Sequence, residues 1–193
     1  MKILQLNSSI HSSSSVSSEL ASLLSQNLLR SHPGSSLTVR DLALNPVSTY
    51  TMEAMVHTYA PEQNSAIAHE YNQLIEEIKN VDTLVIGAPM YNFSISVQLK
   101  AYFDAIAKKG ETFTYTATGA KGLLNINKAY IILSRGGKYK EKNFDFQENF
   151  LTAYLSFIGV KKIEFIYAEG LNMGESIAAQ AITEAREHIA QLV

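Results

Sequence analysis

Three polar segments of this 193-residue chain each follow a short apolar run and carry groups that can bind an anion or a planar ring. The first contains Ser9 and a serine run over 12–15, and it leads into a segment of helical period. Hydroxyl groups and the free amides of a helix N-terminus can bind a phosphate without any lysine or arginine. The alternative is a plain serine loop in which one serine caps the helix.

The second segment, residues 89–96, begins with a proline that ends an apolar run. It offers backbone amides, the aromatic side chains of Tyr91 and Phe93, and the short polar side chain of Asn92. This combination suits the face and edge of a planar ring system. The alternative is a connecting loop in which a polar residue caps the next helix and Phe93 packs on the core.

The third segment is Ser134-Arg135-Gly136-Gly137. A glycine pair at a strand end lets the backbone approach a ligand closely, and its amides can donate to a ring atom that gains negative charge. The alternative is an ordinary turn with Arg135 in a surface ion pair. One such loop is a weak signal, whereas three at neighbouring strand ends favour a binding site.

The elements that must position these segments alternate along the chain. Short apolar runs alternate with segments in which apolar residues recur at a helical period, which is typical of a doubly wound parallel sheet. In such sheets ligands bind beyond the carboxyl ends of the strands. The predicted strands are 2–7, 36–41, 83–88, 129–134 and 161–167, and the predicted helices are 16–30, 66–80, 95–109, 146–158 and 175–192.

Two stretches depart from the alternation. Residues 42–64 form a long connection with prolines near its ends, and loops of this length are usually functional or mobile. Residues 112–124 alternate aromatic residues with threonines and then turn at Gly119, which predicts a small inserted hairpin.

Composition limits the chemistry that these segments can perform. The length predicts one domain over 1–193, and 16 basic against 18 acidic residues give a net charge of -2, which argues against nucleic-acid binding. The absence of cysteine excludes disulfides, thiolate-bound metals and a thiol nucleophile. Redox chemistry would therefore need a bound cofactor.

Metal sites and membranes are not indicated either. The histidines show no paired spacing typical of metal ligands, so we expect no metal. No apolar run approaches the roughly 20 residues that span a bilayer, and the N-terminus lacks a signal-peptide pattern. We expect a cytoplasmic protein. The five histidines are His11, His32, His57, His69 and His188.

Taken together, the motifs resemble those of the FMN-dependent NADH azoreductases, which belong to the flavodoxin-like NAD(P)H quinone oxidoreductases. The resemblance covers essentially the whole chain. It implies a flavodoxin-like three-layer sandwich of strand order 2-1-3-4-5 and a homodimer with each active site at the interface. The motifs are K-I-L-Q-L-N-S-S-I at 2–10, A-P-M-Y-N-F-S-I-S-V-Q-L-K-A-Y-F-D at 88–104, S-R-G-G at 134–137, Y-L-S-F-I-G at 154–159 and Y-A-E-G at 167–170.

The resemblance also implies contacts to FMN, residue by residue. The serine loop would hold the phosphate, with Ser14 as an alternative to Ser15 because the run leaves the register open. The second segment would follow the ring edge and ribityl chain, and the third would meet the pyrimidine end. The implied contacts are Ser9, Ser15, Val16 and Ser17 in the first segment, Met90, Tyr91, Asn92 and Phe93 in the second, and Ser134, Arg135, Gly136 and Gly137 in the third.

The implied reaction is a ping-pong transfer of two electrons from NADH or NADPH, through FMN, to a quinone or azo acceptor. The Gly136 and Gly137 amides could stabilise the charge that develops on the flavin, and no side chain need act as nucleophile or base. Tyr115 and Phe157 match family aromatic residues of the acceptor pocket, with ordinary packing as their alternative role. A flavodoxin-type one-electron carrier is the alternative function.

Overall fold

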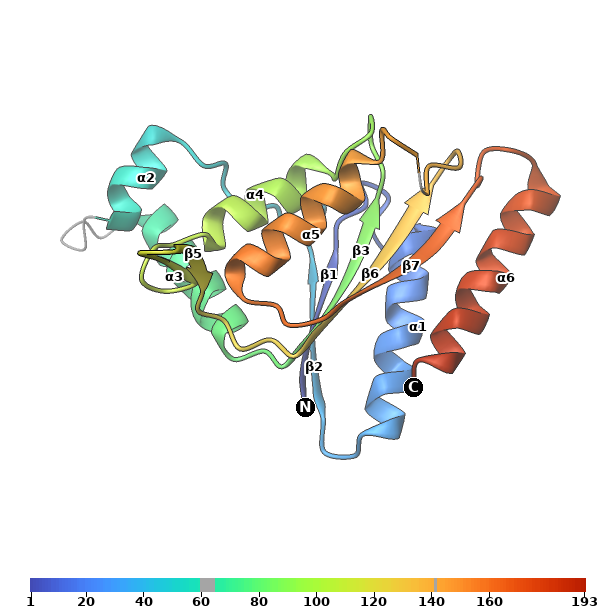
Figure 1. The fold of residues 1–193 in the computed structure, drawn as a ribbon, viewed down its shortest axis with the longest axis horizontal. Coiled ribbons are helices and arrows are strands. Elements are labelled where there is room, and N and C mark those ends of the chain that lie inside the picture. Colours follow the sequence, from blue (N-terminus) through green and yellow to red (C-terminus); the bar gives the residue numbers. More distant parts are fainter. Residues whose placement is uncertain (60–64, 141) are drawn as a thin grey trace.

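A computed structural model, which describes residues 1–59, 65–140 and 142–193, contains one five-stranded parallel sheet of order β2-β1-β3-β6-β7 (Figure 1). Counted along the chain, this is the expected order 2-1-3-4-5. Helices cover both faces of the sheet, as the alternation predicts. The strands are β1 (Lys2–Asn7), β2 (Ser36–Asp41), β3 (Thr83–Pro89), β6 (Lys128–Arg135) and β7 (Ile163–Glu169).

The strand ends differ from the predicted ones where the parallel ladder carries pairing further. The predictions for β1 and β2 are confirmed at both ends. Strand β3 continues to Pro89, which pairs with Ser134 of β6. Strand β6 in turn continues to Arg135, which pairs with Glu169 of β7. The carboxyl ends of β3, β6 and β7 therefore lie one or two residues beyond the predicted ones, and β7 also begins two residues later than predicted.

The helices pack in two groups. Buried residues of α1 and α6 lie on one face of the sheet, and those of α3, α4 and α5 lie on the other (Figure 1). Within the described residues, every helix is too short or too polar to cross a bilayer. The helices are α1 (Val16–Ser31), α2 (Met52–Tyr59), α3 (Ala66–Lys79), α4 (Val97–Ile106), α5 (Phe146–Ile158) and α6 (Glu175–Gln191), with a 3₁₀ turn over Ser12–Ser14.

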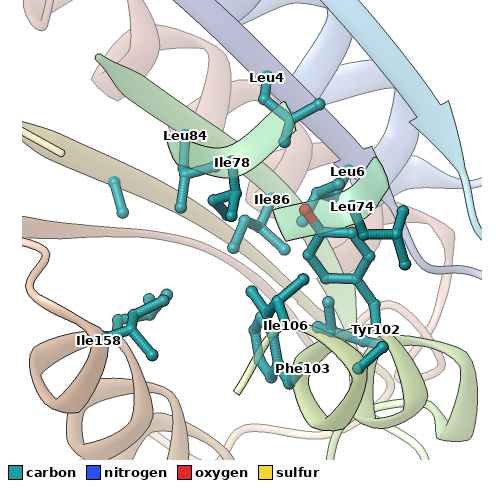
Figure 2. Close-up of a cluster of buried hydrophobic side chains, with 14 of the residues drawn as sticks. Leu4, Leu6, Leu74, Ile78, Leu84, Ile86, Tyr102, Phe103, Ile106 and Ile158 are labelled. Carbon is teal, nitrogen blue, oxygen red and sulfur yellow. The ribbon is translucent and has the colours of Figure 1, made fainter. Parts of the chain in front are cut away.

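The central strands are buried on both faces, which explains their unbroken apolar runs. Successive side chains of a strand point to opposite sides, so Leu84 and Ile86 of β3 face α3 and α4 while Val85 faces α1. Figure 2 shows Leu84 and Ile86 beside Ile78 of α3 and Ile106 of α4. All of β3 is buried, and the carboxyl end of this central strand is therefore rigidly placed.

One helix lies within the long connection that the sequence analysis treated as a loop. Helix α2 begins after Thr51, whose hydroxyl accepts a hydrogen bond from the Ala54 amide at 3.1 Å. Its large apolar residues recur at helical spacing but are exposed, and only Ala54 is buried, so this stripe does not face the core; the exposed residues are Met52, Met55, Val56 and Tyr59. The end of the connection, 60–64, lies outside the described residues.

Helix α4 is shorter than predicted at both ends. It begins at Val97 because the Ser96 hydroxyl caps it, accepting from the Leu99 amide at 3.2 Å. It ends at Ile106, whose carbonyl accepts a hydrogen bond from the Thr112 hydroxyl at 2.7 Å. The predicted end at residue 109 is therefore wrong.

The predicted insertion at 112–124 is confirmed as a hairpin. Strands β4 (Phe113–Thr116) and β5 (Gly119–Gly122) pair antiparallel as a separate sheet. The hairpin is tied to the end of α5, where the Leu124 amide donates to the Ile158 carbonyl at 3.1 Å.

Gly87 of β3 allows the N-terminus of α1 to approach the sheet. A Cβ at this position would lie 3.0 Å from the Ser17 carbonyl oxygen, which is backbone and cannot rotate away. We expect Gly87→Ala to lower the free energy of unfolding by about 1–3 kcal/mol, the usual cost of overpacking. Urea denaturation measures this, and a variant as stable as the wild type would contradict the close approach.

Candidate functional site

A cavity of about 370 Å³ lies beyond the carboxyl ends of β1, β3 and β6, where the polar segments were expected to meet. This volume is in the usual range for small-molecule sites, roughly 300–1,000 Å³. Residues from all three segments line it, together with a fourth segment after β7. The lining residues are Ser9, His11, Ser14, Ser15, Val16, Pro89, Met90, Tyr91, Ser134, Arg135, Gly136, Leu171 and Asn172.

The structure thus brings together eight of the fourteen residues that the sequence analysis named. Ser17, Asn92 and Gly137 are chain neighbours of lining residues, and Phe93 lies two residues from Tyr91, but none of these four lines the cavity. The eight that line the cavity are Ser9, Ser15, Val16, Met90, Tyr91, Ser134, Arg135 and Gly136.

Tyr115 and Phe157 do not line this cavity. Both pack against Phe113 of the hairpin, with ring centroids 5.6 Å and 4.4 Å from it. Tyr115 is nevertheless 64% exposed. Within one chain, the packing role therefore describes Phe157 better than it describes Tyr115.

The first segment combines the two roles considered for it. Ser15 is the N-cap of α1, and its hydroxyl oxygen accepts from the Ser18 amide at 3.2 Å. The amides of Val16 and Ser17, in the first turn, have no acceptor within the helix and can serve an anion. Both Ser14 and Ser15 line the cavity, so the register of the serine run stays open.

Tyr91 joins the second segment to the first. Its hydroxyl lies 3.2 Å from the Ser9 hydroxyl and accepts a hydrogen bond from the Ile10 amide, also at 3.2 Å. The Met90 amide donates to the Ser134 carbonyl at 2.9 Å, which joins the second segment to the third. The three segments therefore form one connected rim.

A strained turn lies between Tyr91 and Ser94. These two residues exchange backbone hydrogen bonds of 2.9 and 3.0 Å, and Asn92 and Phe93 between them have φ of 49° and 68°. A left-handed conformation costs a residue such as phenylalanine about 1–2 kcal/mol. Phe93 is half exposed and meets the rings of two later residues edge-on, so the alternative in which it packs on the core is wrong.

The glycine pair of the third segment presents free amide donors. The Gly136 carbonyl accepts from the Asn172 amide at 3.0 Å, and the Gly137 carbonyl accepts from the Gly170 amide at 2.9 Å. Among residues 1–59, 65–140 and 142–193, neither glycine amide donates a hydrogen bond to a protein acceptor. With their carbonyls anchored, these amides are available to a ligand at this edge.

Arg135 is not in the surface ion pair considered for it. Its side chain is buried and bonded to Asp145 at 2.7 Å, Glu169 at 3.0 Å and Gln147 at 3.1 Å. Its ion-pair partners are distant in sequence and are brought close by the ends of β6 and β7 and the start of α5. The guanidinium is therefore committed to protein groups.

Tyr167 packs beside this cluster. Its ring centroid lies 5.7 Å from the Arg135 guanidinium carbon, and its hydroxyl donates to Glu148 at 2.7 Å. Burial, together with the bond to Glu148, raises the pKa of the Tyr167 hydroxyl well above its usual value. The hydroxyl consequently stays protonated and remains a donor at neutral pH.

Sequence reasoning missed the segment after β7 as part of the site. Leu171 and Asn172 line the cavity, and the Leu171 amide donates to the Arg135 carbonyl at 3.1 Å. Their position just beyond a strand's carboxyl end was the available signal. Within the described ranges, no three acidic or histidine side chains are arranged to hold a metal ion.

Comparisons with known proteins identify the family of this chain. Residues 1–193 match the family model described as having a flavodoxin-like fold. The chain is 41% identical to an FMN-dependent NADH:quinone oxidoreductase of Dechloromonas aromatica (strain RCB), covering 100% of both chains. It is 42% identical to a protein of the same name in Burkholderia thailandensis, covering 97% of this chain and 98% of the relative.

A solved structure shares the fold. It is an FMN-dependent NADH-azoreductase from Bacillus anthracis str. Ames Ancestor in complex with FMN, with a TM-score of 0.84 and 22% identity. The match covers 99% of this chain and 98% of that chain.

The Tyr91 hydroxyl gives a direct test of how the rim is held. We expect Tyr91→Phe to lower the free energy of unfolding by about 1 kcal/mol, the usual net value of a hydrogen bond, and to speed hydrogen exchange at the Ile10 amide. Tyr115→Phe, at an exposed ring, is the control and should change neither. Unaltered Ile10 exchange in Tyr91→Phe would contradict the link between the segments.

Proposed function

The chain belongs to the family with the flavodoxin-like fold, and from this membership we propose that it is an FMN-dependent NAD(P)H oxidoreductase that reduces quinones and azo compounds. One observation carries the proposal: a single cavity has a helix N-terminus in one wall and a free glycine amide in another. That arrangement occurs in a chain 41–42% identical to FMN-dependent NADH:quinone oxidoreductases.

The residues present fit FMN chemically. The first-turn amides of α1 and the nearby serine hydroxyls suit the phosphate, and Tyr91 and the Gly136 amide suit a planar, hydrogen-bonding ring. We propose that residues 1–193 form one FMN-binding domain. The proposed contacts are Ser9, Ser15, Val16, Ser17, Met90, Tyr91, Asn92, Phe93, Ser134, Arg135, Gly136 and Gly137, with Arg135 contributing through its backbone.

When bound, FMN supplies two-electron chemistry, taking a hydride from NADH and passing it to the acceptor. The chain's own part is to hold donors where negative charge develops. The peptide groups that carry the Gly136 and Gly137 amides are already fixed, because the Arg135 carbonyl accepts from the Leu171 amide and the Gly136 carbonyl accepts from the Asn172 amide, so these donors need not reorganise during the reaction. No side chain is required as nucleophile or base.

We propose a ping-pong order, in which NADH leaves before the acceptor binds in the same space. A planar quinone or azo compound suits a cavity whose lining includes the flat ring of Tyr91 and the apolar side chain of Met90. NADH is an intracellular reductant, and we propose the cytoplasm as the location. The physiological donor is NADH in this proposal, following the relatives' names.

We further propose a homodimer in which the hairpin completes the partner's site. Tyr115 is 64% exposed at the hairpin although its neighbour Phe113 is buried. The hairpin is hydrogen-bonded to the end of α5, and the Tyr115 ring packs on Phe113, so the Tyr115 ring has a fixed direction. In a dimer, Tyr115 and Phe157 would close the acceptor pocket of the other subunit.

Absorption and turnover of the purified protein test the central proposal. We expect the absorption bands of oxidised flavin at about 370 and 450 nm, and we expect NADH to be consumed when menadione is added. Reductive titration should show one two-electron step. Two separate one-electron steps would support the flavodoxin-type carrier instead, and full FMN occupancy without NADH consumption would contradict an enzyme.

Tyr115 tests the dimer. We expect Tyr115→Ala to change the free energy of unfolding by less than about 0.5 kcal/mol, because the ring is exposed, while raising KM for menadione about tenfold. Sedimentation should show the wild type as a dimer. A monomeric wild type, or an unchanged KM in the variant, would contradict the role of the hairpin.

A further inference from the structure

We propose that Arg135 is a positioning residue, which holds the second and third segments of the site at a set spacing without touching the cofactor. The inference rests on the proposed function, because the groups it positions are the proposed FMN contacts. Hydrogen bonds leave the Arg135 side chain in two directions.

The first set of bonds runs to the end of β3. Arg135 Nε donates to Gln147 Oε1 at 3.1 Å. Gln147 Nε2 donates to the carbonyls of Ala88 and Pro89 at 3.0 and 3.1 Å. These carbonyls come directly before Met90, and Gln147 is completely buried. The end of β3 is thereby tied to the end of β6 through two side chains.

The second set runs to the segment that follows the glycine pair. Both terminal nitrogens of Arg135 donate to Asp145, at 2.7 and 2.9 Å, and one also donates to Glu169 at 3.0 Å. Glu169 accepts from the Tyr139 and Lys140 amides at 2.8 and 3.0 Å. One guanidinium therefore anchors this segment near both its beginning and its end.

Asp145 extends the same anchor to a helix. It is the N-cap of α5, and its carboxylate accepts from the Glu148 amide at 3.2 Å. The start of α5, which also carries Gln147, is thereby placed by the same guanidinium. Arg135 thus bonds directly to groups of β7 and α5 and to the N-cap Asp145, and it reaches β3 through Gln147.

A role in stability alone explains poorly why Arg135 is buried with Asp145, Glu169 and Gln147. The Arg135 side chain is fully buried, and its two carboxylate partners are 7% and 13% exposed. Desolvation offsets most of the attraction in such a pair, and apolar residues often give equal or greater stability. What apolar residues cannot supply is a planar fork that joins several acceptors in set directions. Here those acceptors lie on the elements that carry the site.

The consequence concerns the Gly136 and Gly137 amides. They follow Arg135 directly, and they serve the ring edge that becomes negative on reduction. Displacing them should harm binding of reduced FMN more than binding of oxidised FMN. A tenfold loss of the preference for reduced FMN lowers the two-electron potential by about 30 mV.

The test compares Arg135→Lys and Gln147→Met with a matched control. Lysine keeps the charge but loses the fork, and methionine keeps the volume of Gln147 but loses both donors. The control is Arg40→Lys, which breaks another two-pronged arginine–carboxylate pair, with Glu77 at 3.1 Å on each prong, outside the cavity.

In the apoprotein we expect hydrogen exchange at the Met90 amide to rise about tenfold in Arg135→Lys and Gln147→Met, and not in Arg40→Lys. In the FMN-loaded protein we expect the potential to fall by about 30 mV, with the Kd of oxidised FMN within about threefold of wild type. With menadione, kcat should fall about tenfold while KM changes less than twofold.

Two outcomes would overturn the role of Arg135 as a positioning residue, and a third would overturn the proposed function. Exchange and potential equal to those of Arg40→Lys would overturn that role, as would the unfolding of both Arg135→Lys and Gln147→Met, which would make the cluster purely structural. A wild type that binds no FMN or consumes no NADH would overturn the proposed function. In that case the exchange measurement on the apoprotein still reports separately whether Arg135 positions the rim.

Discussion

The parallel pairing of β1, β3 and β6 determines where the polar segments can lie, because each ladder places one strand end against its neighbour's. Asn7 of β1 pairs with Gly87 of β3, and Pro89 of β3 pairs with Ser134 of β6. Loops that leave these ends start side by side although they are far apart in sequence. The cavity, the shared rim and the close approach of α1 all follow from that register.

The donors at the site are mostly neutral. Val16 at the start of α1, Gly136, several serines and Tyr91 line the cavity, and the buried charge of Arg135 is bonded to two carboxylates. Fixed dipoles suit a ligand whose charge changes during the reaction, because they need neither titrate nor move. The tight packing behind them, where Gly87 meets Ser17, keeps those dipoles in place.

Sequence patterns predicted the sheet well because buried parallel strands are apolar throughout, and they placed three of the cavity's segments by the rule for strand ends. The sequence predictions were wrong or incomplete at α2, at the end of α4 and at Arg135, where contacts formed only in the folded chain determine the structure. Helix α2 carries apolar residues at helical spacing, but they are exposed and only Ala54 is buried, and α4 ends where the Thr112 hydroxyl donates to the Ile106 carbonyl. The partners of Arg135 lie 10 to 34 residues away, so only the folded chain shows that the side chain is buried.

The strained turn at Asn92 and Phe93 shows how the rim combines these constraints. Glycine would take either φ without strain, so two larger residues need another reason to stand there. Phe93 packs edge-on against Tyr139 and Phe144, at centroid distances of 5.9 and 6.4 Å, and aromatic pairs contribute about 0.5–1.5 kcal/mol beyond burial. The same turn directs the Tyr91 hydroxyl to the first segment. The turn thus connects the serine loop with the segment that Arg135 anchors, and the strain in Asn92 and Phe93 is offset by contacts that a glycine turn would lack.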